Sequence, residues 1–151
     1  MKKSFLLLFV FSFCFVNAQE EKIKNTIHTF FEGLHNGDTA IIIKTIHKDL
    51  KLQTTFVNKE GKSILRNELK DNFLKSVSNK KKEDVWLEKL LYFDINIDEN
   101  LASVWTPYEF YVNGSLSHCG VNSFQLFNNN GNWEIIFLVD TRRRQGCEIK
   151  E

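Results

Sequence analysis

Apolar residues recur at helical spacing near the start of the chain. From Glu20 to His35 they are separated by three or four positions, which places them on one face of a helix. These apolar residues are Ile23, Ile27, Phe30, Phe31 and Leu34. The pattern predicts an amphipathic helix over 20–35 whose apolar face packs on a core.

Two further helices are predicted after the HNGD segment, residues 35–38. Asp38 is a good N-cap for a second helix, and the apolar residues of that helix are Ile41, Ile42 and Ile46. A short strand over Leu50 to Val57 follows. Ser63 can cap a third helix, in which apolar residues recur every four positions at Leu65, Leu69, Phe73 and Val77. Three helices therefore come first.

After Asp84 the pattern changes to the period of two that a half-buried strand requires. Phe93, Ile95 and Ile97 alternate with Asp94, Asn96 and Asp98. Turn signals at 98–100, 113–115 and 128–131 separate four consecutive antiparallel strands of unusual length. Helices followed by such strands predict an α+β fold, in which a curved antiparallel sheet wraps on the N-terminal helices.

The first residues have the layout of a secretory signal peptide. Lys2 and Lys3 precede an apolar run from Phe5 to Val16, and a small residue, Ala18, follows. This run is shorter than the roughly 20 residues that span a membrane. We expect cleavage after Ala18, so that residues 1–18 are the signal peptide. Residues 19–151 would then form a single domain, secreted or periplasmic, without membrane attachment.

Charge and motifs exclude several classes of partner. The chain has 20 Lys and Arg residues against 19 Asp and Glu residues, and loss of Lys2 and Lys3 makes the mature chain slightly acidic. This balance does not favour a nucleic-acid partner. No metal site and no cofactor are predicted, because the sequence has no Cys-x-x-Cys, no Gly-rich phosphate loop and no close histidine pair at ligand spacing. The histidines are His28, His35, His47 and His118.

Three segments in the last third of the chain resemble a known family. They read VWTPYEFYVNG (104–114), HCGVNSFQL (118–126) and WEIIFLVDTRRRQGC (133–147). With the element order, they make the chain resemble a secreted bacterial member of the nuclear transport factor 2-like superfamily. That superfamily includes SnoaL-like polyketide cyclases, ketosteroid isomerase and proteins described as "putative lumazine-binding". The resemblance covers the whole mature chain and implies a cone-shaped fold with a pocket between sheet and helices. No stretch matches the active-site motifs of the characterised enzymes, so the resemblance assigns no catalytic residue.

Strand register determines which side chains share the pocket face. A two-residue turn at Asn113-Gly114 sets His118 opposite Glu109, and a slip of one residue would exchange the faces. In this register one face is apolar at one end and polar at the other, as in a small-molecule site. It carries Trp105, Glu109, His118, Asn122, Phe124, Ile136, Leu138, Asp140 and Arg142.

These side chains suggest particular roles. His118 can act as a general acid or base if Glu109 or Asp140 orients it, which makes these three the candidate catalytic residues. Asp140 and Arg142 are either an anion-binding or acid–base pair at the pocket mouth, or a structural ion pair with Glu109. Cys119 points away from His118, so the two form no dyad through their own strand. The candidate ligand-binding residues are Trp105, Asn122, Phe124 and Arg142.

Two cysteines, Cys119 and Cys147, remain after the predicted loss of Cys14. A pair of cysteines in a secreted protein suggests a disulfide. A straight strand would hold them about 20 Å apart, whereas a bridge needs Cα atoms about 5.5–6 Å apart. The chain would have to turn back at Gln145-Gly146. A disulfide and two free thiols both stay open.

The leading hypothesis is an exported domain that binds a small molecule of unspecified identity. The alternative is a cofactor-independent isomerase, dehydratase or cyclase that uses His118 with a carboxylate. A third hypothesis is a structural or partner-binding module. A homodimer through the outer sheet face is left open.

Export predicts that the mature protein begins at Gln19. When the full chain is expressed in a bacterial host, we expect the intact mass of the purified protein to lack residues 1–18. An Ala18→Arg variant should keep them, because the processing site requires a small residue. Retention of residues 1–18 in the unaltered protein would contradict export.

Overall fold

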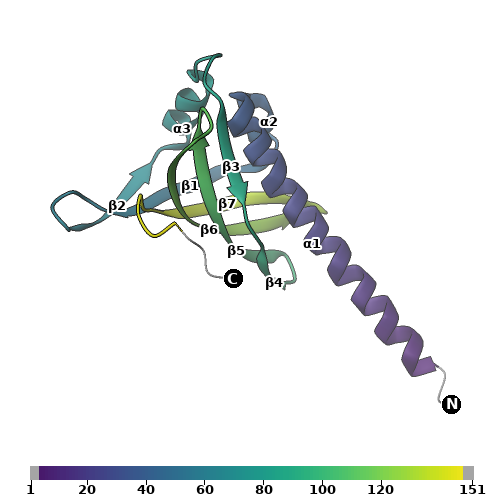
Figure 1. Ribbon diagram of the computed structural model, residues 1–151. Coiled ribbons are helices and arrows are strands. Elements are labelled where there is room, and N and C mark those ends of the chain that lie inside the picture. The colour runs from purple at the N-terminus through teal and green to yellow at the C-terminus, as the bar shows by residue number, and fades with distance from the viewer. Residues whose placement is uncertain (1–3, 148–151) are drawn as a thin grey trace.

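The computed structural model describes residues 4–147, with side chains described from Ala18 onward. One curved, unclosed sheet of seven strands lies against three helices (Figure 1). The helices are α1 (Ser4–Asn36), α2 (Thr39–Ile43) and α3 (Lys70–Ser78). The strands are β1 (Ile46–Val57), β2 (Ser63–Glu68), β3 (Trp86–Leu90), β4 (Asp94–Asp98), β5 (Leu101–Val112), β6 (Ser115–Asn129) and β7 (Asn132–Arg142).

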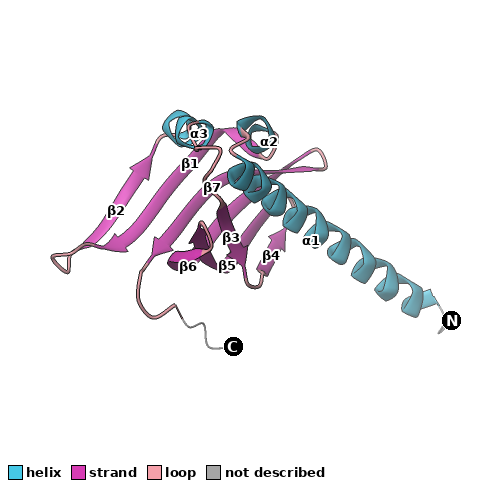
Figure 2. Cartoon of the chain, turned by 45° about the horizontal axis from the view of Figure 1, so that its top comes forward, coloured by secondary structure: helices cyan, strands magenta, loops and turns pink. Residues whose placement is uncertain are grey.

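The strand order is β2-β1-β7-β6-β5-β3, and β4 also pairs with β5. Strands β5, β6 and β7 form the predicted antiparallel meander. Strand β1 joins it in parallel, with Leu52 opposite Leu138, a pairing that the sequence pattern did not predict. The helices gather on one side of the sheet (Figure 2). The predicted α+β fold, with a curved sheet on N-terminal helices, is confirmed.

Helix α1 covers the core because its apolar residues lie on one face. Ile23 and Ile27 are fully buried, and they share one apolar cluster with Phe124 and Leu126 of β6. The helix is longer than predicted, and its N-terminal turns project beyond the sheet (Figures 1 and 2). No helix in the described range 4–147 is both long and apolar enough to cross a membrane.

Helix α2 begins directly after the predicted N-cap, Asp38, but ends before Ile46, which was predicted to belong to it. The Oδ1 atom of Asp38 accepts hydrogen bonds from the backbone N–H groups of Ala40, at 2.9 Å, and Ile41, at 3.2 Å, as expected of an N-cap. The helix ends at Ile43, so Ile46 belongs to β1 and not to this helix.

The predicted third helix is wrong at its start. Residues Ser63–Glu68 form β2, which pairs with β1 from Val57↔Ser63 onward. A hydrogen-bonded turn produces this hairpin, because the side chain of Asn58 accepts from the backbone N–H groups of Glu60 and Lys62. Helix α3 then begins at Lys70, after Leu69. Local turn chemistry outweighed the four-residue apolar spacing in this segment.

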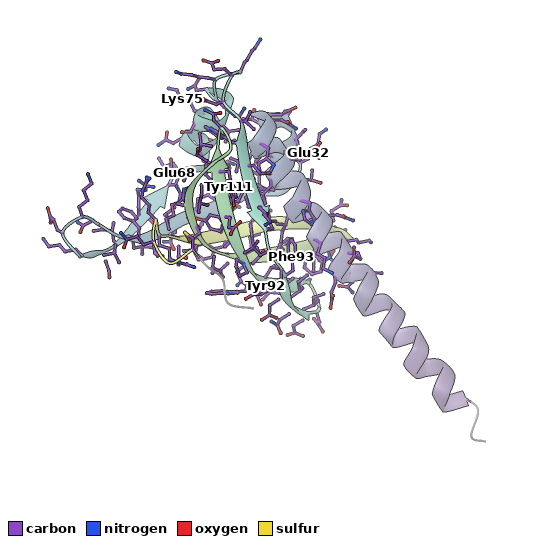
Figure 3. All side chains as sticks on the ribbon, viewed as in Figure 1. Glu32, Glu68, Lys75, Tyr92, Phe93 and Tyr111 are labelled. Atoms are coloured by element: carbon purple, nitrogen blue, oxygen red, sulfur yellow. A yellow bond between two sulfur atoms is a disulfide. The ribbon has the colours of Figure 1, made fainter. Side chains whose placement is uncertain are left out.

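The first long strand of the predicted meander is divided into two. Strand β3 pairs with one half of β5, from Tyr108 to Val112, and β4 pairs with the other half, from Leu101 to Trp105. The backbone N–H of Leu91 donates to the carbonyl of Pro107, at 3.0 Å, between these halves. Tyr92 and Phe93, labelled in Figure 3, follow this break.

A β-bulge changes the register between β5 and β6. The predicted turn pair, Val112 opposite Ser115, is present. The register then shifts between Phe110 and Tyr111, so that Phe110 and not Glu109 lies opposite His118. A bulge inserts one residue, which exchanges the faces of the residues beyond it. The predicted pairing of His118 with Glu109 is therefore wrong.

Gly120 lies where β6 passes closest to β7. A Cβ atom at this position would lie 1.7 Å from the backbone oxygen of Thr141 and 2.9 Å from the ring of Tyr108. Tyr108 is the cross-strand partner of Gly120, and its hydroxyl donates to that same oxygen, at 3.0 Å. The missing side chain of Gly120 therefore lets Tyr108 reach across β6 to β7.

Substitution of Gly120 should strongly destabilise the fold. We expect Gly120→Ala to lower the free energy of unfolding by about 3 kcal/mol or more, because the clash is with backbone atoms that cannot rotate away. Urea unfolding followed by circular dichroism measures this change. Ser123→Ala, on the same strand, is the control, expected to change it by about 0.5 kcal/mol or less. Equal effects of the two substitutions would contradict the close approach.

Candidate functional site

A cavity of about 330 Å³ lies between α1, α3 and the inner face of the sheet. Its volume is within the range of small-molecule sites, roughly 300–1,000 Å³. Aromatic and aliphatic side chains form most of its wall: Phe30, Phe31, Leu34, Phe73, Trp86, Phe110, Val112 and Leu138. Polar side chains complete the wall: Glu88, His118, Asn122, Asp140 and Arg142.

The aromatic wall comes from four elements. Phe30 of α1 and Phe73 of α3 stack with ring centroids 5.8 Å apart and planes 9° apart. Trp86 of β3 lies edge-on to Phe110 of β5, with centroids 6.4 Å apart. Aromatic pairs in these geometries are favourable, so the wall is rigid and suits a flat apolar ligand.

Asp140 is a buried carboxylate that accepts hydrogen bonds from Thr54, Tyr108 and the partly exposed Arg142. The carboxylate is 6% exposed, so it needs hydrogen-bond donors. Thr54 donates to its Oδ1 atom at 2.6 Å. Arg142 Nε donates to its Oδ2 atom at 2.6 Å, and the Tyr108 hydroxyl, whose one proton is shared with the carbonyl of Thr141, lies 3.1 Å from the same atom. The predicted Asp140–Arg142 ion pair is formed, but Glu109 is not part of it.

Glu88 is a polar cavity residue that the sequence analysis did not predict. It lies on β3, and its Oε1 atom accepts a hydrogen bond from Asn122 Nδ2 at 2.6 Å. Removal of the carboxyl group from water raises the pKa of Glu88 to about 8; the bond from Asn122 opposes this shift, and the charge of Asp140 adds to it. Glu88 is therefore mostly protonated at neutral pH and can donate a hydrogen bond.

His118 lines the same cavity as an uncharged ring. Burial lowers its pKa to about 4, and the positive charge of Arg142 contributes to this shift. The ring lies against Phe110, with centroids 4.9 Å apart, and its Nδ1 atom is 3.2 Å from Ser117 Oγ. At neutral pH His118 can accept and donate hydrogen bonds, but it cannot supply the proton of an imidazolium.

Glu88 also borders a second, shallower depression between α1 and β3. The depression is lined by His28, Phe31, Glu32, His35, Asn36, Glu88 and Leu90, and Glu32 is labelled on α1 in Figure 3. The backbone N–H of Glu88 donates to His35 Nε2 at 2.7 Å. Burial, with the charge of Lys80, lowers the pKa of His35, which fits an imidazole nitrogen that accepts.

The structure separates the candidate residues named from the sequence. His118, Asn122, Asp140 and Arg142 line the cavity together. Phe124 is fully buried in the core behind it, against Phe30 and Phe31.

The other two candidates lie on the outer face of the sheet. Trp105 is 49% exposed there, opposite Ser123. Glu109 lies opposite Cys119, accepts a hydrogen bond from Tyr111 at 2.9 Å and lies 3.7 Å from Lys89. The bulge after Phe110 turned both away from the cavity.

Cys119 and Cys147 are joined in a disulfide, with Cα atoms 5.6 Å apart. Cys119 exchanges two backbone hydrogen bonds of 2.9 Å with Arg143, and the chain then turns back through Gly146, where φ is 64°. Arg143 Nε donates to the carbonyl of Gly146. The bridge thus fixes the segment after β7 to β6 at Cys119, the cross-strand partner of Glu109.

The cavity wall contains aromatic residues that the sequence did not assign to a site. Phe30, Phe31 and Phe73 were recognised as apolar helix positions, and Trp86 and Phe110 were not singled out. The spacing of apolar residues cannot tell a core position from a cavity wall, because both face inward. The period of two over Trp86, Glu88 and Leu90 could have indicated that Glu88 points inward.

A curved sheet wrapped on N-terminal helices, with a cavity between them, defines the nuclear transport factor 2-like (NTF2-like) class of proteins. Solved structures share this fold. A conserved protein from Planctomyces limnophilus is 16% identical, with a TM-score of 0.68 over 84% of this chain and 98% of that chain. An NTF2-like protein from Cytophaga hutchinsonii is 16% identical, with a TM-score of 0.65 over 83% of this chain and 98% of that chain. The association domain of C. elegans CaMKII is 15% identical, with a TM-score of 0.60 over 82% of this chain and 95% of that chain.

The sequence then specifies the family within this class. The family model described as "Putative lumazine-binding" matches residues 18–138, and the chain belongs to this family. A comparison with curated proteins gave no match.

Glu88 should make the protein less stable as the pH rises above neutrality. Its pKa of about 8 in the folded state exceeds its ordinary value of 4.5, so its stabilising contribution is complete below pH 4.5 and is lost as the pH rises through 8. His35 and His118 have lowered pKa values and affect stability only below their ordinary value of 6.5. Between pH 6.5 and 8 we expect the free energy of unfolding in urea to fall by up to about 1.4 kcal/mol per pH unit.

Glu88→Gln should abolish this slope, because glutamine does not titrate. Glu109→Gln, which changes a glutamate on the outer face, should retain it. The same slope in wild type and Glu88→Gln would show that Glu88 is not protonated in the folded state.

Proposed function

We propose that the chain binds a small, flat heterocyclic molecule of the lumazine type in the cavity. The observation that carries this proposal is the composition of the cavity wall, in which paired aromatic rings adjoin a group of hydrogen-bonding side chains. Cavities of this kind bind the apolar body of a ligand by burial and select its orientation by a few polar contacts. The family's description supports lumazine as the first ligand to test.

The polar groups favour an uncharged or weakly polar ligand. Asp140 and Arg142 neutralise each other through the 2.6 Å contact, and Arg142 bonds Asp140 through Nε. The terminal guanidinium nitrogens form no hydrogen bond with the described residues, so they are available to a ligand oxygen. His118 is uncharged because burial lowers its pKa to about 4.

We further propose that the protein works outside the cytoplasm. The signal-peptide pattern of residues 1–18 supports export. The Cys119–Cys147 disulfide supports it independently, since disulfides persist mainly in oxidising compartments.

Catalysis in the same cavity is the second candidate function, and one observation favours it. The cavity holds a protonated carboxyl group, Glu88 with a pKa of about 8, and an uncharged imidazole, His118 with a pKa of about 4. Environments that separate two titratable groups in this way are typical of acid–base sites. The sequence predicted Glu109 or Asp140 as the carboxylate that orients His118. Asp140 lines this cavity, and Glu109 does not.

Substitution of two tryptophans, Trp86 in the cavity wall and Trp105 on the outer face, tests the proposed binding. Calorimetric titration of the purified mature protein with lumazine should give saturable binding of one molecule per chain. Trp86→Leu should weaken the affinity about tenfold, because it removes an aromatic wall.

Trp105→Leu is the matched control, since Trp105 is exposed on the outer face, and it should leave the affinity unchanged. No binding to the wild type, or an equal loss in both variants, would contradict the proposal. Chromatography, ultraviolet spectra and mass of the lumazine recovered after incubation test the second function, which requires a chemical change that wild type catalyses and His118→Gln does not.

A further inference from the structure

We infer that Glu88 and Asn122 form a donor–acceptor pair that recognises a lactam edge, an N–H group beside a C=O group, on the uncharged ligand. This inference rests on the proposed function and specifies which part of the ligand enters the polar end of the cavity.

One hydrogen bond fixes both side chains. Asn122 Nδ2 donates to Glu88 Oε1 at 2.6 Å. The two residues come from β6 and β3, which flank β5 on either side, and both line the cavity. The contact occupies Nδ2 and Oε1, so Oδ1 of Asn122 and Oε2 of Glu88 remain for other partners.

These two remaining oxygens are accessible. Among the described residues, the buried side-chain atoms without a partner are Gln19 Oε1, Thr106 Oγ1 and Trp133 Nε1. Neither Glu88 Oε2 nor Asn122 Oδ1 is one of them, and neither takes part in a hydrogen bond between the residues that the structure describes. Both atoms must therefore keep some accessible surface, and the cavity that their residues line provides it.

The carboxyl proton of Glu88 makes Glu88 the donor and Asn122 the acceptor of the pair. Because Oε1 already accepts from Asn122, the proton of the acid form belongs on Oε2, which then donates. Oδ1 of Asn122 is a carbonyl oxygen and accepts. A donor beside an acceptor complements the C=O and N–H groups of a lactam, as found in lumazine and other oxidised nitrogen heterocycles.

Burial favours the acid form of Glu88 over the opposing effects of Asn122 and Arg142 on its pKa. Side chains of four elements face Glu88. They are Asn122 on β6, Asp140 and Arg142 on β7, Tyr108 on β5, and His28, Glu32 and His35 on α1. The negative charge of Asp140 opposes a second carboxylate, and the positive charge of Arg142 is already engaged by Asp140. His35 accepts the backbone N–H of Glu88 and adds no proton on that nitrogen. An uncharged ligand edge is matched to this environment.

The first experiment compares lumazine with 1,3-dimethyllumazine, in which both ring N–H groups are replaced. Calorimetric titrations use the folded wild type, Glu88→Gln and Asn122→Leu at pH 6.5. The wild type should bind lumazine about tenfold more tightly than the methylated compound, because an unpaired buried polar group is costly. Glu88→Gln, which can still donate and accept, should retain this preference, and Asn122→Leu, which removes the oxygen that accepts the ligand N–H, should reduce it below about twofold.

The same titrations at about pH 9 test whether binding requires the carboxyl proton of Glu88. The affinity of wild type relative to Glu88→Gln should fall about tenfold from pH 6.5, since ionised Glu88 no longer donates. The titration of lumazine itself cancels in this ratio. A preference for lumazine that persists in Asn122→Leu would mean that methylation acts by bulk, and it would overturn the inference while the proposed function stands. Tighter wild-type binding at the higher pH would overturn it in favour of a cationic ligand group.

A measurement without ligand tests the acid form directly. The infrared spectrum at pH 6.5 should contain a carboxylic-acid C=O band that disappears at about pH 9, is absent from Glu88→Gln and persists in the control Glu109→Gln. Absence of the band from wild type would overturn the inference. Failure of wild type to bind lumazine at all would instead defeat the proposed function, and the lactam reading with it.

Discussion

The burial of the Asp140 carboxylate is the constraint on which the rest of the site depends. A buried carboxylate must be hydrogen-bonded, because the cost of leaving it unpaired is several kcal/mol. Its donors come from three strands: Thr54 on β1, Tyr108 on β5 and Arg142 on β7 itself. To bring them together the sheet must curve, β1 must run beside β7, and Gly120 must leave room for the Tyr108 ring. The same contacts set Arg142 at the cavity wall.

The curvature of the sheet and the packing of the helices together leave a cavity between them. Helices packed on a flat sheet would leave no such space. Helix α1 buries its apolar face over the middle of the sheet, with Ile23 and Ile27 fully enclosed. Near its C-terminal end, Phe30 and Phe31 meet Phe73 of α3 and the wall residues of β3 and β5 instead. Rings pack by their faces and edges and cannot bend to fill a concave corner, so space remains there. Polar residues on β6 and β7 close this space.

The polar end combines groups that the sequence scattered over the chain. Glu88, Asn122, Asp140 and Arg142 belong to three strands, and each changes the protonation or position of another. Burial raises the pKa of Glu88 to about 8, while burial and Arg142 lower that of His118 to about 4. A site that is nearly uncharged at neutral pH, despite its ionisable side chains, follows from these opposite shifts. That property is why an uncharged heterocycle is the ligand we propose.

The sequence by itself determined the amphipathic first helix, the Asp38 cap and the long strands after Asp84. It also determined that His118 shares a side with Asn122 and that Asp140 shares a side with Arg142, because spacing and parity within a strand are local properties. That both pairs line one cavity depends on the pairing of β6 with β7. Tertiary structure decided the rest. The β2 hairpin replaced part of a predicted helix, and the bulge after Phe110 removed Trp105 and Glu109 from the cavity. Glu88 entered the site because β3 pairs with β5 in a register that no local pattern specifies. Register depends on contacts between distant strands, and a shift of one residue exchanges the two faces.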